Sequence, residues 1–360
     1  MRPAPVLTEV LRIKLITKAG VKRLATLFIL ILFLVSVGSC FMVNMPGESF
    51  RGPLPELTTD EASLIAVLRR DVDHLCGEIG DRNVVAYEGL CEAADFIEDE
   101  LKQAGYEVER QGYDVKGKIC YNMTAEIRGH EKANEIIVIG GHYDSVSGCP
   151  GANDNGTGAL AVVALAREFA GKRFARTLRF VTFVNEEPPY FQTAAMGSRV
   201  YARRCRKRRE NIVAMLSLET IGYYSDEPGS QKYPFPFSLF YPETGNFIAF
   251  VANTRSRRLV RQVIATFRRE ARFPSEGVAT FGWLPGIGWS DQWSFWQEGY
   301  PGIMVTDTAP FRYPHYHRVT DTPDKIDYER FARVVSGIGR TMAEMAEMAE
   351  IDGEGTNVAK

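Results

Sequence analysis

The chain has 360 residues, of which 45% are hydrophobic and 24% are charged, so it can bury a full hydrophobic core. At roughly 150 residues per domain, we expect one large domain or two small ones. The formal net charge of −2 argues against a general nucleic-acid-binding protein, and we expect no nucleic acid among its partners. No pattern in the sequence determines the oligomeric state.

The N-terminal part of the chain contains an apolar run, residues 24–43, that has no charged side chain. At roughly 1.5 Å per residue, a helix of this length spans the hydrocarbon core of a bilayer, which is about 30 Å thick. Residues 1–23 are basic and contain one acid, Glu9, an asymmetry that keeps the N-terminus in the cytoplasm and exports the rest of the chain. We therefore predict a basic cytoplasmic segment, 1–23, and a transmembrane anchor or signal segment, 24–43.

Two alternatives to an anchor remain open for this apolar run. A cleaved signal peptide has a shorter apolar core, usually about 7–15 residues, and a buried core helix is a further possibility. The sequence "VGSC" at Val37–Cys40 also resembles an imperfect lipoprotein cleavage site. The anchor and the signal both predict a protein of the membrane or cell exterior, with its main domain in the periplasm or the extracellular space.

The remaining cysteines are widely spaced and show no CxxC pattern, so no zinc site built from cysteine is indicated. An exported domain could form up to two disulfides from them, but their pairing cannot be deduced from the sequence. These cysteines are Cys76, Cys91, Cys120, Cys149 and Cys205.

After the apolar run, a Pro/Gly-rich linker is predicted at 44–57, followed by one domain at 58–350 and a flexible tail at 351–360. Within the domain, helical and fully apolar strand patterns alternate. Apolar strands of this kind fit a sheet that helices cover on both faces, which predicts an α/β fold. The strand patterns lie at 135–141, 177–184, 212–218, 247–253 and 301–308, and the helical ones at 62–70, 91–104, 158–170, 197–209, 256–271 and from 328. Residues 225–245 are predicted to form a long surface loop.

Groups that can bind a metal or move a proton come after the successive predicted strands. Ligands of open α/β sheets collect beyond the carboxyl ends of the strands, so we expect these side chains to meet there. They are His142, Asp144, Asp154, Glu186, Glu187, Glu219 and His317. Taken alone, His142 would more often be a structural histidine, and Asp154 a helix cap. Their convergence after successive strands favours a shared site.

Carboxylates and imidazoles without a thiolate suit zinc, manganese or cobalt. Five ligands, one of them a bridging carboxylate, would make two metal sites, and paired metals about 3.5–4 Å apart are used by hydrolases. Asp144 could accept the second ring N–H of His142 and so fix its tautomer. Glu186 and Glu187 alternate at a strand end, which predicts different directions and different roles.

These residues lie in motifs that resemble the family-twenty-eight zinc metallopeptidases, a family of di-zinc aminopeptidases and their relatives. The resemblance runs in order from about Gly141 to Thr322 through "HYDS", "GANDNGTG", "NEE" with "MGS", "LET", "SDQ" and "YHRVTDT". It implies a three-layer α/β/α sandwich on a mixed, mostly parallel sheet. It also implies an exopeptidase, with an aminopeptidase as the expected type, that acts on peptides or small proteins. Together with the apolar run 24–43, this predicts a membrane-tethered enzyme that acts outside the cytoplasm.

The resemblance also implies a role for each site residue. One zinc ion would be held by His142 and Glu219 and a second by Glu187 and His317, with Asp154 bridging them, so the expected cofactor is two Zn²⁺ per chain. Glu186 would be the general base that takes a proton from the metal-bridging water, and Asp144 would support His142. The peptide bond between Asp154 and Asn155 would be cis.

Two departures from the family pattern bear on the site. Gln292 replaces a histidine in the usual Ser-Asp-His run, which puts any acid–base role there in doubt, and "EEPPYF" at 186–191 changes the adjoining pocket. All four tryptophans lie within 283–296, where core packing and a substrate pocket both remain open, and Trp289 and Trp293 are predicted to share a helical face.

Two functions compete with the di-zinc exopeptidase. A glutaminyl cyclase-like acyltransferase has a similar site but uses one zinc ion, whereas the intact "DNGTG" loop and Glu219 favour two ions and hydrolysis. A non-catalytic receptor or scaffold domain of the same fold would be expected to have lost ligands, and all five ligand positions here hold competent side chains. A metal count of two, one or none separates the three.

Overall fold

The structure is a computed structural model that describes residues 18–347. One compact unit ends at Val43 and contains helix α1 (Lys18–Val43), and a second unit begins at Asn44. The predicted tail and most of the predicted basic segment lie outside the described residues. Within residues 18–347, no helix combines the length and the apolarity that a membrane span needs.

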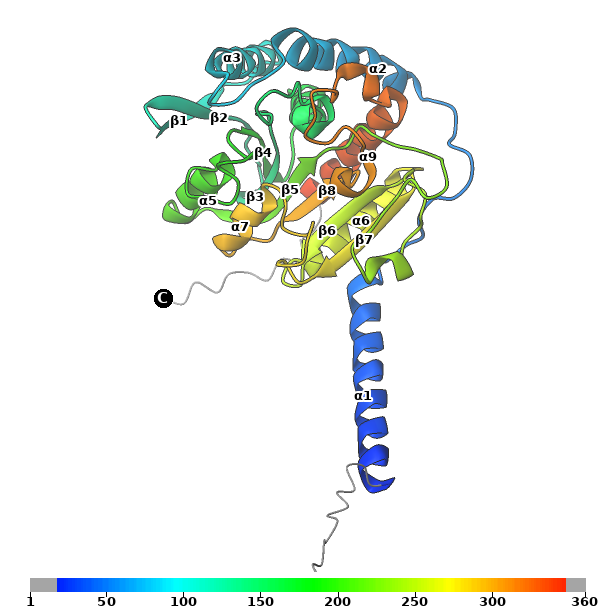
Figure 1. The fold of residues 1–360 in the computed structure, drawn as a ribbon. Coiled ribbons are helices and arrows are strands. Elements are labelled where there is room, and N and C mark those ends of the chain that lie inside the picture. The colour runs from blue at the N-terminus through cyan, green and yellow to red at the C-terminus, as the bar shows by residue number, and fades with distance from the viewer. Residues whose placement is uncertain (1–17, 348–360) are drawn as a thin grey trace, which may run out of the picture. The chain divides into compact units, whose positions relative to one another are not determined.

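The second unit is built on a mixed sheet whose strands have the spatial order β1-β2-β4-β3-β5-β8-β6-β7 (Figure 1). The central strands β4, β3, β5 and β8 are parallel to their neighbours in that group, while β1–β2, β2–β4 and β6–β8 are antiparallel pairs. β6 and β7 are parallel. The strands are β1 Glu109–Val115, β2 Lys118–Ile127, β3 Lys132–His142, β4 Arg176–Phe183, β5 Asn211–Glu219, β6 Ile248–Asn253, β7 Ser275–Thr280 and β8 Ile303–Thr306.

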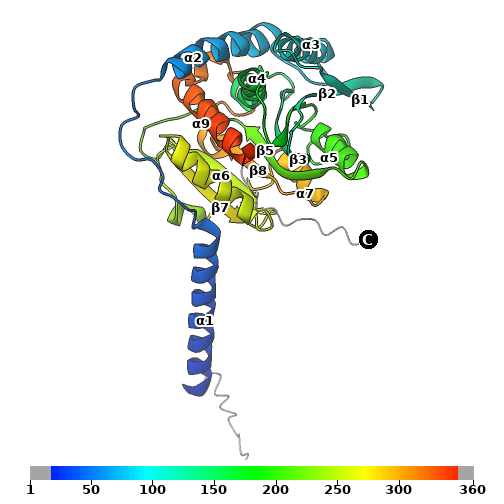
Figure 2. The same ribbon diagram turned by 180° about the vertical axis from the view of Figure 1, so that it is seen from behind.

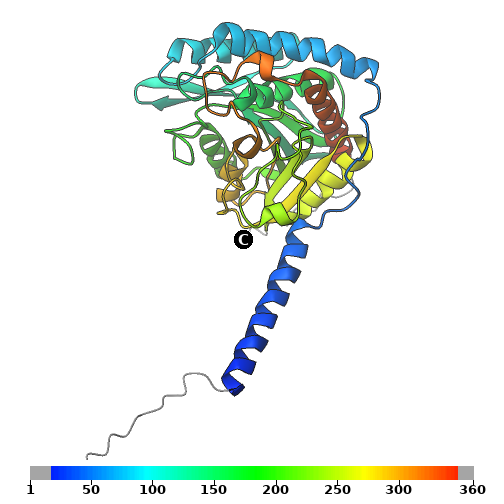
Figure 3. The same cartoon turned by 45° about the vertical axis from the view of Figure 1, so that its right-hand side comes forward.

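Helices cover both faces of this sheet. The helices of the second unit are α2 Thr59–Val72, α3 Tyr87–Gln103, α4 Gly158–Phe169, α5 Gly197–Lys207, α6 Arg257–Glu270, α7 Gln292–Gln297, α8 Ala309–Arg312 and α9 Tyr328–Glu347. Helices α4, α6 and α9 pack on one face. They are labelled in Figure 2, which is turned by 180° from Figure 1. Helices α5 and α7 pack on the opposite face. Figure 3 shows α2 and α3 along one edge of the unit.

Strand β3 illustrates why fully apolar strands form here. Its side chains alternate between the two faces, so Ile137 and Ile139 join the core under α4 and α9, while Ile136 and Val138 join the core under α5 and α7. All four are buried. A strand that is covered on both sides needs apolar residues at every position, and the prediction of an α/β fold with a doubly covered sheet is confirmed.

Three strands, β1, β2 and β7, were not predicted from the sequence. The edge strand β1 is polar and largely accessible to solvent, and it joins β2 through a turn in which Lys116 and Gly117 both have positive φ. β7 is short and its Gly277 faces Ile264 and Met45. Neither β1 nor β7 shows the apolar run or the alternation that marks a strand.

The first residues of the second unit, 44–49, pack along its α6 and β7. Met45 is buried there, Arg268 Nη1 donates to the Gly47 carbonyl at 2.9 Å, and Ser275 N donates to Ser49 Oγ at 2.9 Å. The cysteines outside α1, all of them described, are free thiols.

The region 225–245 covers the β6–β8 end of the sheet instead of standing free of it. Tyr233, Phe237 and Tyr241 pack on a small core formed by Phe247, Ala249, Val251, Val278, Ile287 and Met304. The buried Arg312 of α8 fastens this loop, because its Nε donates to Gln231 Oε1 at 2.7 Å and its Nη1 donates to the Phe247 carbonyl at 2.9 Å. At the β6–β8 end of the sheet, the 225–245 loop therefore covers the core residues that a helix would otherwise cover.

Candidate metal centre

The carboxyl ends of three adjacent strands deliver four of the predicted site residues to one place. His142 is the last residue of β3 and Glu219 the last of β5, while Glu186 and Glu187 come shortly after the end of β4. β3 lies between β4 and β5 and is parallel to both, so these three ends lie side by side. All four side chains are buried.

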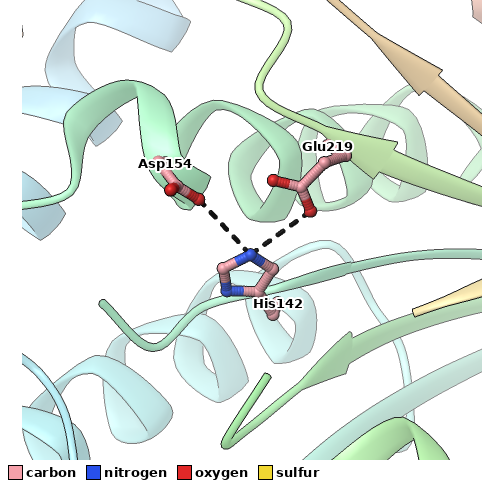
Figure 4. Close-up of side chains that lie close together, drawn as sticks. All are labelled: His142, Asp154 and Glu219. Carbon is pink, nitrogen blue, oxygen red and sulfur yellow. Dashed lines mark ion pairs between the residues drawn. The ribbon is translucent and has the colours of Figure 1, made fainter. Parts of the chain in front are cut away.

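A first group of donor atoms surrounds His142 (Figure 4). Its Nε2 lies 3.3 Å from Glu219 Oε2 and 3.6 Å from Asp154 Oδ1. These three residues offer one donor atom each within 4.8 Å of one another.

A second group of donor atoms surrounds His317. Its Nε2 lies 3.0 Å from Asp154 Oδ2 and 3.3 Å from Glu187 Oε2. His317 has a φ of 56° in the loop before α9, and the Tyr316 ring stacks on its imidazole with centroids 3.9 Å apart. These three residues form the other triad of donors.

The two triads share Asp154, which directs one carboxylate oxygen to each imidazole. The structure thus brings together all five predicted ligands, and it places Asp154 between the two groups as the predicted bridge requires. Two ligands bound tetrahedrally to one zinc ion at about 2.0–2.2 Å stand roughly 3.3–3.6 Å apart. The observed separations of 3.0 to 3.6 Å leave room for an ion between the donors.

Several of these donor atoms have no other partner. His142 Nε2, Asp154 Oδ2 and Glu187 Oε1 are buried and make no hydrogen bond within residues 18–347. A buried polar atom without a partner costs free energy, so each such atom is expected to have a use. Imidazole nitrogens and carboxylate oxygens together are ligands that zinc prefers, and the residues present fit that ion.

The electrostatics of the site also favour a bound cation. Burial raises the pKa of Glu187, the neighbouring Asp154 carboxylate raises it further, and the net result is a pKa of about 8 despite the opposing effect of His317. Burial lowers the pKa of His317, but Asp154 and Glu187 outweigh this effect and raise the pKa to about 10. A divalent ion would pair with these buried carboxylates and offset both the cost of their burial and their mutual repulsion.

Asp144 holds the glutamate pair and the first histidine together. Its Oδ1 accepts a hydrogen bond from the Glu186 backbone N at 3.1 Å and its Oδ2 accepts one from the Glu187 backbone N at 3.2 Å. Asp144 Oδ1 also lies 3.5 Å from His142 Nδ1. The Asp144 backbone carbonyl oxygen is nearer to the same ring nitrogen, at 3.2 Å, so Asp144 lies on the opposite side of the ring from the other donors. Its carboxylate also positions the chain that carries both glutamates.

The two adjacent glutamates point to different groups, as their alternation predicts. Glu187 belongs to the triad of His317, whereas Glu186 belongs to neither triad, and its Oε2 lies 3.7 Å from His142 Nε2. Burial raises the pKa of Glu186 well above its usual value, His142 lowers it, and the Glu219 and Glu187 carboxylates raise it further. A carboxylate that is close to the donors but is not one of them is available for proton transfer.

The loop 151–158 is held in place from two sides. The Asp321 carboxylate accepts hydrogen bonds from the backbone N of Asn153 and of Asp154, at 2.9 and 3.0 Å. The Asn155 side chain donates to the Leu218 carbonyl at 2.9 Å, which ties the loop to the end of β5. A Cβ at Gly158 would collide with that same carbonyl oxygen, so the loop requires glycine there. The Asp154–Asn155 peptide bond is cis, as the resemblance implies.

Ser290 supports Glu219 directly. Its Oγ donates to Glu219 Oε2 at 2.6 Å and lies 2.8 Å from Ser217 Oγ. Two residues on, the buried Gln292 donates from Nε2 to the Ile287 carbonyl at 3.1 Å. The glutamine at this departure from the family pattern thus holds the preceding loop.

Sequence reasoning missed the supporting roles of Ser290, Asp321 and Asn155. In the sequence, Ser290 stands out only as part of "SDQ", and Asp321 only as part of "YHRVTDT". Their position within the motifs is the one feature of the sequence that could have indicated these supporting roles. Their partners lie far along the chain, so the contacts themselves are not visible in a local pattern.

The tryptophans differ from their predicted arrangement. Helix α7 begins at Gln292, so Trp289 precedes it and does not share a helical face with Trp293, contrary to the prediction. Trp283 is 78% exposed and Trp289 42% exposed, so core packing does not account for them.

Comparison with known proteins places this site among zinc peptidases. The family model described as Peptidase family M28 matches residues 122–342. The chain is similar to "Uncharacterized protein YfbL" of Escherichia coli K12, with 34% identity over 280 residues that cover 75% of this chain and 85% of that protein. It is also similar to a "Probable zinc metalloprotease" of Pyricularia oryzae, with 28% identity over 57% of this chain and 43% of that longer protein.

Solved structures share the fold at low sequence identity. An aminopeptidase from Aneurinibacillus sp. strain AM-1 is 18% identical, with a TM-score of 0.60 over 82% of this chain and 97% of that one. A glutaminyl cyclase from Fimbriiglobus ruber is 20% identical, with a TM-score of 0.55 over 81% of this chain and 99% of that one. Both the peptidase and the cyclase therefore have this fold.

The hydrogen bond from Ser290 to Glu219 should tune metal affinity. We expect Ser290→Ala to weaken zinc binding by roughly 10–100-fold, because it removes the donor that orients a ligand carboxylate. Titration of zinc against a competing chelator measures the change. Ser294→Ala is the matched control, because Ser294 is also buried but its hydroxyl contacts Ser198 at 2.8 Å and no ligand. Equal affinities of the two variants would show that Ser290 has no such role.

Proposed function

This chain belongs to peptidase family M28 and is a zinc metallopeptidase, and we propose that it is an exopeptidase that removes N-terminal residues from peptides by using two zinc ions. The observation that carries the proposal is the pair of donor triads that share Asp154. A site for one ion would need only one triad. The second triad has no evident structural purpose, since its carboxylates repel one another in a buried place.

A pocket beside the centre supports the choice of the N-terminus. Glu219 and Tyr316 are among its lining residues, and most of the others are apolar and come from the β6–β8 end of the sheet and the 225–245 loop. Besides the proposed zinc ligand Glu219, its lining includes the carboxylate of Glu276 and no lysine or arginine among the described residues. Such a lining favours the free ammonium group of an N-terminal residue and disfavours a free carboxylate.

The chain's own residues have separable tasks in hydrolysis. His142, Glu219, Glu187, His317 and Asp154 would hold the ions. When bound, zinc supplies Lewis-acid polarisation of the scissile carbonyl and lowers the pKa of water. Glu186 takes a proton from the attacking water as the water oxygen bonds to the carbonyl carbon. It then gives that proton to the leaving nitrogen as the carbon–nitrogen bond breaks. Asp144 is a positioning residue that fixes the backbone of Glu186.

Cyclisation of N-terminal glutamine is the competing function, because glutaminyl cyclases share this fold. The second triad favours the peptidase, since Glu187 and His317 would not both be needed to hold a single ion. A non-catalytic domain is disfavoured because Glu186 and all five donors are present and converge.

Peptide assays with purified full-length protein test this proposal. We expect release of the N-terminal residue from a peptide with a free amine, no release from its N-acetylated form, and full release from its C-terminally amidated form. Chelation should abolish activity, and added zinc or cobalt should restore it. Cleavage of the acetylated peptide from its C-terminus, undiminished activity of metal-free protein, or conversion of glutaminyl peptides to a cyclic product without shortening would contradict the proposal.

Variants of the two glutamates should differ from each other in kcat and in zinc content. We expect Glu187→Gln to lower zinc content, because it removes a charged donor of one triad. Glu186→Gln should retain both ions and cut kcat by roughly 10²–10⁴-fold, because it removes the proton acceptor. Metal analysis and steady-state kinetics on both variants measure this difference, with the exposed Glu227→Gln as control. Metal loss from the Glu186 variant alone would reverse the assignment.

We propose further that residues 24–43 tether the enzyme to a membrane or export it. The uncharged run after a basic segment supports this location. We expect the full-length chain in the membrane fraction, resistant to a carbonate wash, and its domain to be cleaved by protease added outside the cell or spheroplast. Cys40→Ser should change the mature mass only if Cys40 is lipidated. Full-length protein in the cytoplasmic supernatant would contradict the proposed location.

A further inference from the structure

A hollow on the surface of the second unit gathers all four tryptophans of the chain. We call it the tryptophan hollow; it is lined by aromatic side chains and by a polar set, namely Phe281, Trp283, Trp289, Trp293 and Trp296 with Gln192, Asn253, Thr254, Arg255 and Gln297. Trp283, Trp289 and Phe281 are 78%, 42% and 47% exposed. Exposed aromatic side chains that gather in one concave place mark binding sites more often than accidents of packing.

Hydrogen bonds to the backbone hold two of the side chains that line the hollow. Trp296 Nε1 donates to the Gly302 carbonyl at 2.9 Å, and Gln192 Nε2 donates to the Gly288 carbonyl at 2.9 Å. The Phe281 and Trp283 rings are stacked with centroids 5.9 Å apart. By contrast, the indole N–H groups of Trp283, Trp289 and Trp293 donate to no atom of the described chain. Aromatic rings whose indole N–H groups have no partner are suited to a ligand that brings both apolar surface and carbonyl groups.

Trp289 joins this hollow to the proposed active site. It lines the tryptophan hollow and also the apolar pocket that reaches Glu219. Its ring stacks against Phe311 of that pocket at 6.4 Å, and the next residue, Ser290, donates to Glu219. Trp289 therefore forms a wall that the hollow and the pocket share.

An exopeptidase must hold the terminal residue of its substrate in a bounded pocket and let the rest of the peptide extend away from it. The pocket beside Glu219 is bounded by the sheet and the 225–245 loop, which suits the terminal residue. The tryptophan hollow is open to solvent at Trp283, which suits the continuing chain. We propose that the tryptophan hollow binds the residues beyond the scissile bond and that the enzyme prefers aromatic or large apolar side chains there. This inference rests on the proposed exopeptidase function.

The preference should appear in hydrolysis of two peptides that differ only beyond the first residue. We expect Leu-Phe-Phe to have a higher kcat/KM than Leu-Gly-Gly, and Trp283→Ala to reduce that preference by about 3- to 10-fold, the worth of one aromatic contact. Trp283 is highly exposed, so its removal should not disturb folding. Val85→Ala, which truncates an apolar side chain that is 79% exposed and lines neither the hollow nor the pocket, should leave the preference unchanged.

Tryptophan fluorescence gives a second measurement that does not depend on turnover. Because every tryptophan of the chain lines the hollow, binding there should change the emission of the whole protein. With Glu186→Gln, we expect saturable changes with Leu-Phe-Phe at concentrations where Leu-Gly-Gly has little effect. Phenylalanine does not emit under tryptophan excitation, so the signal comes from the protein.

The outcomes distinguish this inference from the function on which it rests. Hydrolysis of both peptides with equal kcat/KM, or a Trp283→Ala preference equal to that of Val85→Ala, would overturn the role of the hollow and leave the peptidase intact. A fluorescence response to an N-acetylglucosamine oligomer, with none to Leu-Phe-Phe, would also overturn it in favour of a carbohydrate ligand. Failure to hydrolyse any peptide would contradict the proposed function, whatever the fluorescence shows.

Discussion

The buried carboxylate of Asp154, placed between two imidazoles, is the constraint on which the rest of the site depends. One oxygen faces His142 and the other faces His317, so the two triads exist only while this side chain keeps its position. Burial alone would raise the pKa of Asp154, but both histidines lower it below its usual value. The carboxylate therefore stays charged in a place where an unpaired charge would be costly.

The fold meets this constraint through contacts made from two directions. Strand order puts β4, β3 and β5 side by side, so Glu187, His142 and Glu219 reach the same edge of the sheet. The loop that carries Asp154 is tied to β5 through Asn155 and to the C-terminal region through Asp321. The covered faces of the sheet keep these ends rigid, since β3 packs in two separate cores. On the loop-covered part of one face, space remains for the apolar pocket and the tryptophan hollow.

The sequence allowed the central sheet and the ligand set to be predicted, because both leave local patterns. β3, β4 and β5 are apolar at nearly every position, and each donor comes after a predicted strand or lies in a glycine-rich or histidine-bearing loop. Contacts such as Ser290 to Glu219, or Asp321 to the backbone of Asp154, join segments 71 and 167 residues apart and leave no local pattern. The hairpin of β1 and β2 was missed because β1 is a polar edge strand, and Trp289 was misplaced because its helix begins later.

Anomalous X-ray diffraction at the zinc absorption edge, on crystals of the zinc-loaded protein, tests the central claim most directly. The account predicts two peaks on either side of the Asp154 carboxylate, one next to His142 and Glu219 and the other next to Glu187 and His317, separated by about 3.5–4 Å. A single peak, or peaks that do not contact Asp154, would contradict it.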